Sequence, residues 1–346
     1  MSKYKGRLIV LGVLVVVLAL VAVLLARKTP QTQAISGGFS YITSIYGVLA
    51  PFGVATDVDQ NIYVSNTGKS EVDVYDKDGN FQFKVDTKDQ DGNPLQFRAN
   101  MADIAVDDSR DRVYVCDYNF RGVRVLNKAG DFQFNLPRDP KDFPAGQLFA
   151  PYGIAIYGDK EYVTSWAGIY IFDADGKYVG HWGTDKQGKD KGQFNYAEGI
   201  VVDPNTGNFF VADSLNRRIV ALNSSGQVRW MVGSPDVNGN ITSPFGLPKG
   251  IALGPDGNVY VSDNFNNQFV VLTQDGDVVS VFGEKGDQNG QVNFPDGIAI
   301  TSTKRFYICD RMNNRIQIWQ LPDTLPQPDP SQAASFKKAF IKGDAP

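Results

Sequence analysis

One short motif recurs six times along this chain of 346 residues and restricts the fold more than any other feature. In its commonest form it reads Pro-x-Gly-Ile-Ala, and Gly53 in the first copy lies five repeats before Gly297 in the last. The period is therefore about 49 residues, which is typical of repeat architectures. The six copies begin at Pro51, Met101, Pro151, Ala197, Pro248 and Pro295. We expect each repeat to form one structural unit.

Each unit contains four short runs rich in β-branched and aromatic residues. The motif opens the first run, and the second run ends in a small residue that is usually followed by Asp, as in the run that ends at Asp263. A third, alternating run leads into a glycine turn such as Asp275-Gly276 and then into a fourth run. Short strands joined by tight turns predict an antiparallel four-stranded sheet, and radial repetition of such sheets is a β-propeller.

The two ends of the repeat region indicate how the ring closes. The sixth copy stops after its third run, at Gln320, and therefore lacks a fourth strand. Residues 39–47 precede Pro51 in the way that a fourth run precedes every later copy. We expect residues 39–47 to complete the last sheet, so that the all-β propeller spans residues 39–320.

These units resemble NHL repeats, and the resemblance covers residues 39–320. It implies a six-bladed β-propeller, a fold whose members include binding modules, scaffolds and a minority of enzymes. Two copies depart from the pattern. The second has Asp103 where the motif has Gly, and the third has Trp166 at the position that is usually Asp.

The ends of the chain outside the propeller have different compositions. Leu8–Leu25 contains eighteen apolar residues and no charge, long enough to span a bilayer as a helix. Basic residues flank it with a small N-terminal excess, so residues 1–27 are predicted to be a cytoplasmic stub and a single-pass signal anchor. A cleaved signal peptide is the alternative, although the apolar run is longer than is usual for a signal peptide.

The remaining segments outside the propeller are a linker and a tail. Residues 28–38 have linker composition, and residues 321–346 form a Pro-rich tail. The amphipathic segment of the tail, 335–342, either docks on the propeller, docks on a partner, or frays.

The variable position of the motif should place one side chain from each unit around the mouth of the central channel. The candidate binding residues there are Phe52, Tyr152, Glu198, Lys249 and Asp296. Three carboxylates near one axis, those of Asp103, Glu198 and Asp296, form a candidate calcium site, because calcium prefers oxygen ligands. The chain is similar here to calcium-dependent six-bladed hydrolases of the gluconolactonase and paraoxonase kinds, but their Asn and Asp ligands have no residue-by-residue match in it.

Catalytic residue types are scarce. The one histidine, His181, falls in a predicted outer strand, and no catalytic residue is assigned. Cys116 and Cys309 share a repeat position that Ser165 and other small residues occupy elsewhere, and they lie in non-adjacent blades, so we expect two buried thiols and no disulfide. A net charge of −4 and a pI of about 5.2 oppose nucleic-acid binding.

Together these features favour a membrane-tethered extracytoplasmic propeller that acts as a protein-binding or assembly module, as a subunit of a membrane or cell-surface complex. Protein partners rank first and a surface glycan second, with no nucleic acid and no required cofactor. The alternative is a calcium-dependent hydrolase or lyase with its site at the channel mouth. Because no set of catalytic residues is recognised in the sequence, the enzyme is the weaker hypothesis.

Overall fold

A computed structural model of the chain describes residues 33–35, 38–85, 101–143, 150–184, 186–233, 244–336 and 338–340. Residues Ala34–Pro346 form one compact unit. The other unit, Met1–Gln33, contains the predicted anchor Leu8–Leu25 and, apart from Gln33, lies outside the described residues. In the part of the chain that the structure describes, no helix is long and apolar enough to cross a membrane.

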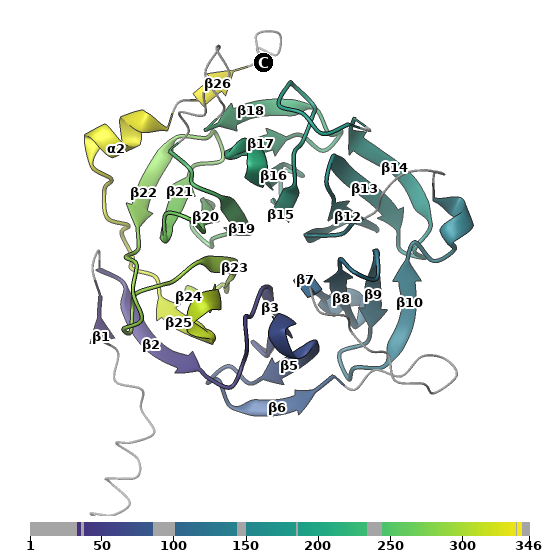
Figure 1. Ribbon diagram of the computed structural model, residues 1–346, viewed down its shortest axis with the longest axis horizontal. Coiled ribbons are helices and arrows are strands. Elements are labelled where there is room, and N and C mark those ends of the chain that lie inside the picture. The colour runs from purple at the N-terminus through teal and green to yellow at the C-terminus, as the bar shows by residue number, and fades with distance from the viewer. Residues whose placement is uncertain are drawn as a thin grey trace, which may run out of the picture. The chain divides into compact units, whose positions relative to one another are not determined.

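The described residues form six antiparallel sheets, which are arranged around a central axis as the blades of a propeller (Figure 1). Blade one contains β3 (Val54–Thr56), β4 (Ile62–Asn66), β5 (Glu71–Tyr75) and β6 (Phe81–Lys84). Blade two contains β7 (Met101–Asp107), β8 (Arg112–Asp117), β9 (Gly122–Leu126) and β10 (Phe132–Leu136). Blade three contains β11 (Ile154–Tyr157), β12 (Lys160–Thr164), β13 (Gly168–Asp173) and β14 (Tyr178–Gly183). The all-β propeller that the sequence predicted is confirmed.

The remaining blades follow the same order, with the first strand innermost. Blade four contains β15 (Ala197–Val202), β16 (Phe209–Asp213), β17 (Arg218–Leu222) and β18 (Val228–Val232). Blade five contains β19 (Pro248–Leu253), β20 (Val259–Asp263), β21 (Gln268–Leu272) and β22 (Val278–Phe282). Blade six contains β23 (Pro295–Ile300), β24 (Arg305–Asp310), β25 (Arg315–Gln320), β2 (Ser40–Ile45) and, at its edge, β1 (Gln33–Ala34).

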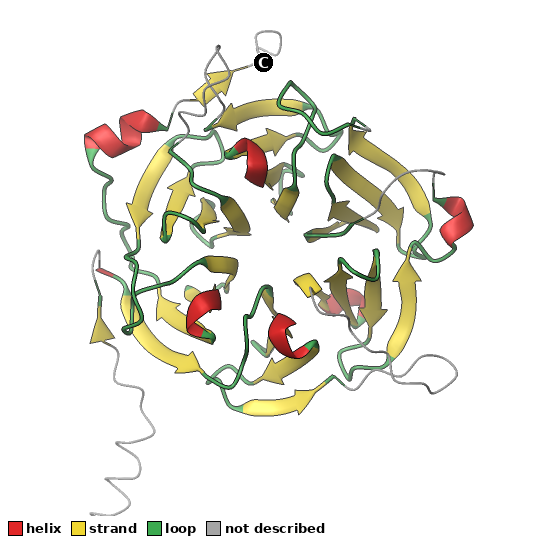
Figure 2. Ribbon diagram, viewed as in Figure 1, coloured by secondary structure: helices red, strands yellow, loops and turns green. Residues whose placement is uncertain are grey.

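Short 3-10 helices occupy several turns (Figure 2). η2 (Thr67–Lys69), η5 (Ser214–Asn216) and η6 (Arg311–Asn313) connect the second and third strands of blades one, four and six. η3 (Asp108–Arg110) connects β7 to β8, and η4 (Pro140–Asp142) follows β10.

The motif glycine is explained by close contact between the innermost strands of adjacent blades. A Cβ at Gly153 would lie 2.1 Å from the carbonyl oxygen of Glu198, and a Cβ at Gly250 would lie 2.4 Å from that of Asp296. Real Cβ atoms do not approach so closely, so only glycine allows the two backbones to meet. The carbonyl that each of these glycines meets belongs to the variable residue of the next copy, which places the variable residues around the axis.

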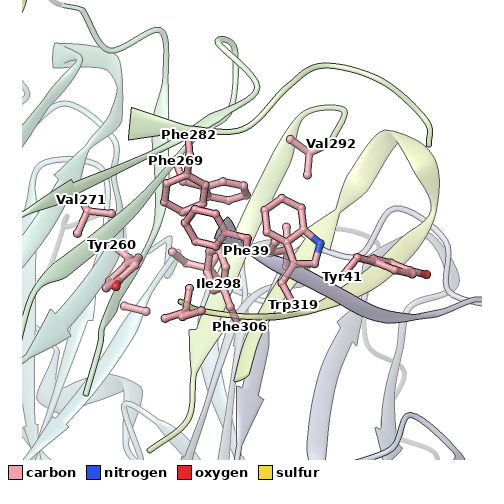
Figure 3. Close-up of a cluster of buried hydrophobic side chains, with 13 residues drawn as sticks. Phe39, Tyr41, Tyr260, Phe269, Val271, Phe282, Val292, Ile298, Phe306 and Trp319 are labelled. Atoms are coloured by element: carbon pink, nitrogen blue, oxygen red, sulfur yellow. The ribbon is translucent and has the colours of Figure 1, made fainter. Parts of the chain in front are cut away.

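Residues at the two ends of the repeat region close the ring. β2 pairs antiparallel with β25, and Ile45 lies opposite Ile316, so β2 occupies the place that the sequence analysis assigned to residues 39–47. Phe39, immediately before β2, is 1% exposed and stacks on Phe282 of blade five at 4.0 Å between ring centroids. Its cluster also contains Trp319 of β25 (Figure 3). The N-terminal strand is therefore fixed by hydrogen bonds and by a core shared with two blades.

The C-terminal tail follows the outer surface of the propeller from blade six past blade five to blade four (Figure 1). It contains α2 (Pro330–Ser335) and β26 (Lys338–Phe340), and β26 pairs antiparallel with β18. Phe336 is 7% exposed and meets Phe245 edge-on at 5.0 Å. The described part of the tail therefore docks on the propeller, which was one of the alternatives for it.

In blade three, the repeat positions that the sequence analysis assigned to Ser165 and Trp166 are shifted by one residue in the structure. Thr164 Oγ1 accepts the N–H of the motif glycine at 2.8 Å and donates to a carbonyl of the next blade at 2.7 Å, as Ser262 does in blade five. Thr164, and not Ser165, therefore holds the small-residue position. Ser165, and not Trp166, follows it at the Asp position. The alignment was wrong here because the first hairpin of blade three is one residue shorter than that of blade five.

Candidate functional site

The turns between second and third strands and the connections between blades lie on one face, which we call the mouth face. Gly68 in η2 donates its N–H to the carbonyl of Leu49, which precedes the first motif. Met312 in η6 donates in the same way to Asn293 of the connection before blade six. These bonds hold turn and connection side by side, so side chains from both can contribute to one surface.

A charge cluster lies at the centre of the mouth face, where the inner strands of blades four, five and six begin. Lys249 Nζ lies 3.2 Å from Glu198 Oε2 and 3.4 Å from Asp296 Oδ1. Arg311 Nη1 lies 3.1 Å from Asp296 Oδ2. Phe52 of blade one covers both cations, with its ring centroid 4.9 Å from Lys249 Nζ and 5.7 Å from Arg311 Cζ. Four of the five predicted binding residues are therefore brought together.

Burial and pairing act in opposite directions on this cluster. Burial raises the pKa of Glu198, and the charge of Lys249 only partly offsets the rise. Burial alone would lower the pKa of Lys249, but the carboxylates of Asp296 and Glu198 raise it above its usual value. Asp296 also accepts a hydrogen bond of 2.7 Å from Asn264 Nδ2. Lys249 is thus held as an ammonium between two carboxylates.

Asp103 lies apart from this pairing. It lines the central cavity together with Glu198, and burial raises its pKa to about 7 although the N–H groups of Ile104 and Ile154 hydrogen-bond to its carboxylate. The proposed metal ligands Asp103, Glu198 and Asp296 do not form a ligand set here: Lys249 stands between the last two. Among the described residues, no group of three His, Cys, Asp or Glu is placed to hold a metal ion.

Two hollows flank the predicted binding residues. The central cavity, of about 280 Å³, is lined mostly by apolar residues and glycines of the six innermost strands. A second pocket of about 220 Å³ opens between blades one, two, three and six on the mouth face. Phe52 and Tyr152 contribute to both hollows. Tyr152 therefore belongs to the site as well.

An aromatic cluster that the sequence analysis missed continues from Tyr152 across blades two, three and four. Tyr118 lies 5.3 Å from Tyr152 and 6.3 Å from Trp166 between ring centroids, and Tyr196 lies 5.8 Å and 5.9 Å from the same two rings. All four side chains are half-buried. Tyr196 has φ 57°, and the residues that precede the motif in blades one and six, Ala50 and Phe294, have the same left-handed conformation, so it belongs to the repeat. The available signal in the sequence was the position of Tyr118 and Trp166, each within two residues after the end of a second strand.

Exposed apolar side chains occupy one repeat position in three consecutive blades. Leu215, Phe265 and Met312 each lie two residues after the Asp that ends the second strand, and they are 45%, 54% and 59% exposed. They lie on the mouth face because their turns do. Single exposed apolar residues scattered over a surface are normal, but here they recur at the same position of three neighbouring blades, which is typical of an interaction surface.

The single histidine and the two cysteines are held in β-strands. His181 lies in the outer strand β14, where its Nδ1 is 2.9 Å from the hydroxyl of Tyr178. Cys116 and Cys309 are buried and form no disulfide, and burial raises the pKa of both thiols well above the usual value. A raised pKa favours the protonated thiol at neutral pH, and the thiolate is the nucleophilic form.

Comparison with known families identifies two of the repeats. The family model described as NHL repeat matches residues 245–272 and 292–319, in blades five and six. The chain is a six-bladed β-propeller that contains NHL repeats. No curated protein sequence matches it significantly.

Solved structures of several kinds share the propeller fold of this chain. Virginiamycin B lyase of Staphylococcus aureus is 15% identical, with 84% of this chain and 98% of that chain covered and a TM-score of 0.53. The WD40 propeller domain of Doa1 is 11% identical, with 86% and 99% covered and a TM-score of 0.55. A protein of unknown function from Bacteroides thetaiotaomicron is 17% identical, with 84% and 74% covered and a TM-score of 0.57. At these identities the likeness extends to the fold alone.

Proposed function

We propose that this protein is a membrane-tethered extracytoplasmic propeller whose mouth face binds another protein. A closed propeller holds the described turns of its blades in fixed relative positions, so these turns need little ordering when a partner binds. The partner binds the mouth face, and neither the opposite face nor the rims of the blades contribute to its recognition.

The observation that carries this proposal is the composition of the mouth face. Leu215, Phe265 and Met312 are exposed there in neighbouring blades, and the half-buried aromatic cluster of blades two to four lies beside them. Tyr, Trp, Phe, Met and Arg are the residues most enriched where proteins bind one another. A protein partner is therefore favoured over a glycan, for which the described residues offer no comparably specific feature.

The tether is proposed from the sequence of Leu8–Leu25, whose apolar length and flanking charges suit a signal anchor. We expect the full chain to stay in the membrane fraction after extraction at high pH. We also expect protease added outside intact cells to digest the propeller. Release of the chain by the extraction would contradict the tether and leave the mouth-face proposal standing.

Photo-crosslinking of the full chain in its own cells tests the binding face. Benzoylphenylalanine is placed at Phe265 or Met312 on the mouth face, and at Val58, which is 73% exposed in the turn between β3 and β4, as the matched control. We expect one specific crosslinked partner from both mouth-face positions and none from Val58. Phe265→Asp should abolish the crosslink from Met312 without lowering the melting temperature. Crosslinks from Val58 alone would refute the proposal.

The calcium-dependent hydrolase is the weaker candidate, because the ammonium of Lys249 occupies the space between Glu198 and Asp296. A bound calcium ion stabilises a folded protein by mass action, so it must raise the melting temperature. We expect melting curves in millimolar calcium and in EDTA to coincide. A calcium-dependent rise that Asp103→Asn removes would establish the metal site instead.

A further inference from the structure

The second pocket on the mouth face has an apolar interior and a cationic rim. Its wall is formed by Phe52, Met101, Ala102, Tyr118 and Tyr152, and Arg311 lies at its edge. Its volume of about 220 Å³ exceeds the roughly 150 Å³ that accommodates benzene in an engineered protein cavity. The pocket is therefore large enough for one aromatic or branched apolar side chain.

Arg311 presents hydrogen-bond donors to this pocket. Its Nη1 bonds to Asp296, its guanidinium lies over the ring of Phe52, and its side chain is 35% exposed. Within the described residues, no other hydrogen bond engages its remaining N–H groups, of which a guanidinium has five in all. A planar guanidinium with free donors is suited to bind a carboxylate through two parallel hydrogen bonds.

The lining of the pocket contains a cation and no carboxylate among the residues that the structure describes, and that cation is Arg311. The neighbouring turns of blades one and two, at 67–70 and 118–121, contain Lys69 and Arg121 and no Asp or Glu. Asp296, the carboxylate that Arg311 contacts, is also paired with Lys249. A carboxylate that enters the pocket therefore meets a cation in its lining and no like charge there.

From these observations we infer that the pocket binds the C-terminal residue of a partner polypeptide, with its carboxylate on Arg311 and its apolar side chain against Phe52, Met101 and Tyr118. A C-terminal residue carries the carboxylate and the side chain on the same carbon, which matches a cation at the rim of an apolar pocket. An internal Asp or Glu does not supply an apolar group in this relation. The inference rests on the proposed function for the source of its ligand.

Calorimetric titration of the full chain in detergent with small peptides tests this inference. The probes are acetyl-glycyl-glycyl-phenylalanine as the free acid, the same peptide as its C-terminal amide, and 3-phenylpropionate. We expect saturable binding of the free acid and at least tenfold weaker binding of the amide. Equal binding of acid and amide, or no binding of the acid at millimolar concentration, would overturn the inference. Stronger binding of 3-phenylpropionate than of the peptide would overturn the polypeptide source.

Three variants distinguish the pocket from general effects of charge or folding. Arg311→Gln should weaken binding of the free acid at least tenfold, and Arg229→Gln should not change it. Arg229 is the matched control because it is 31% exposed and paired with Asp275 away from the mouth. Tyr118→Ala removes an apolar wall without touching the charge cluster and should also weaken binding. Equal loss with Arg229→Gln would refute the site, whereas crosslinking from Phe265 tests the proposed function independently.

Discussion

Truncation of Phe39 to alanine should destabilise the propeller by about 3–5 kcal/mol, the usual cost of removing a fully buried phenylalanine ring. Phe39 is 1% exposed and packs against Phe282 of blade five and Trp319 of blade six (Figure 3). Its loss leaves a cavity where the N-terminal strand joins two blades. With an unfolding entropy of about 2.1 cal/mol/K per residue over roughly 280 residues, the melting temperature should fall by about 5–8 °C.

Thermal melting of the full chain, followed by tryptophan fluorescence, measures this effect. Tyr46→Ala is the matched control, because Tyr46 follows the same strand and is 64% exposed. The control should melt within about 1 °C of the wild type, since surface truncations rarely exceed 0.5 kcal/mol. Hydrogen exchange should increase in β2 and β25 of the Phe39 variant before it increases in blade three. If Phe39→Ala melts with the wild type, or Tyr46→Ala falls equally far, the argument that the N-terminal strand closes the ring is refuted.

Three further perturbations test other parts of the fold. Arg218→Met should destabilise the protein by about 3–5 kcal/mol and increase hydrogen exchange at residues 186–194, because buried Arg218 holds Asp213 and three carbonyls of that connection; unchanged exchange would contradict this role. Burial raises the pKa of Glu161 to about 7, so its contribution to stability is lost as pH rises from about 4.5 to 7. The melting temperature should therefore fall less over that range in Glu161→Gln than in the wild type, and parallel curves would refute the shift. Phe336→Ala should cost about 3 kcal/mol and release the tail to protease, whereas an intact tail would show that β26 alone holds it.

Much of the propeller could be predicted from the sequence because each blade is specified locally. The motif glycine, the alternating third strand and the glycine turn recur in every copy or nearly so. At the turn after β5, Gly79 has φ 85° and Asp76 Oδ1 accepts the N–H groups of Asp78 and Asn80, which are interactions within one short segment. Such short-range interactions depend on neighbouring residues, so they leave a recurring pattern in the sequence.

The site could be predicted only in part. The variable motif position identified Phe52, Glu198, Lys249 and Asp296, because the repeat puts equivalent positions around one axis. It did not reveal that Lys249 lies between the two carboxylates, since side-chain pairing across blades depends on the geometry of the ring. For the same reason the three carboxylates suggested a metal site without showing which of them already have partners.

What the sequence alone determined is the unit, its number and its closure: the six copies of the motif and the missing fourth strand after Gln320 follow from the order of residues along the chain. What only the tertiary structure decided is which side chains meet at the mouth. Phe52 and Arg311 are more than 250 residues apart, and their contact exists because β2 closes the ring and brings blade one beside blade six. Local patterns specify strands and turns, whereas contacts between distant residues arise only when the strands have packed.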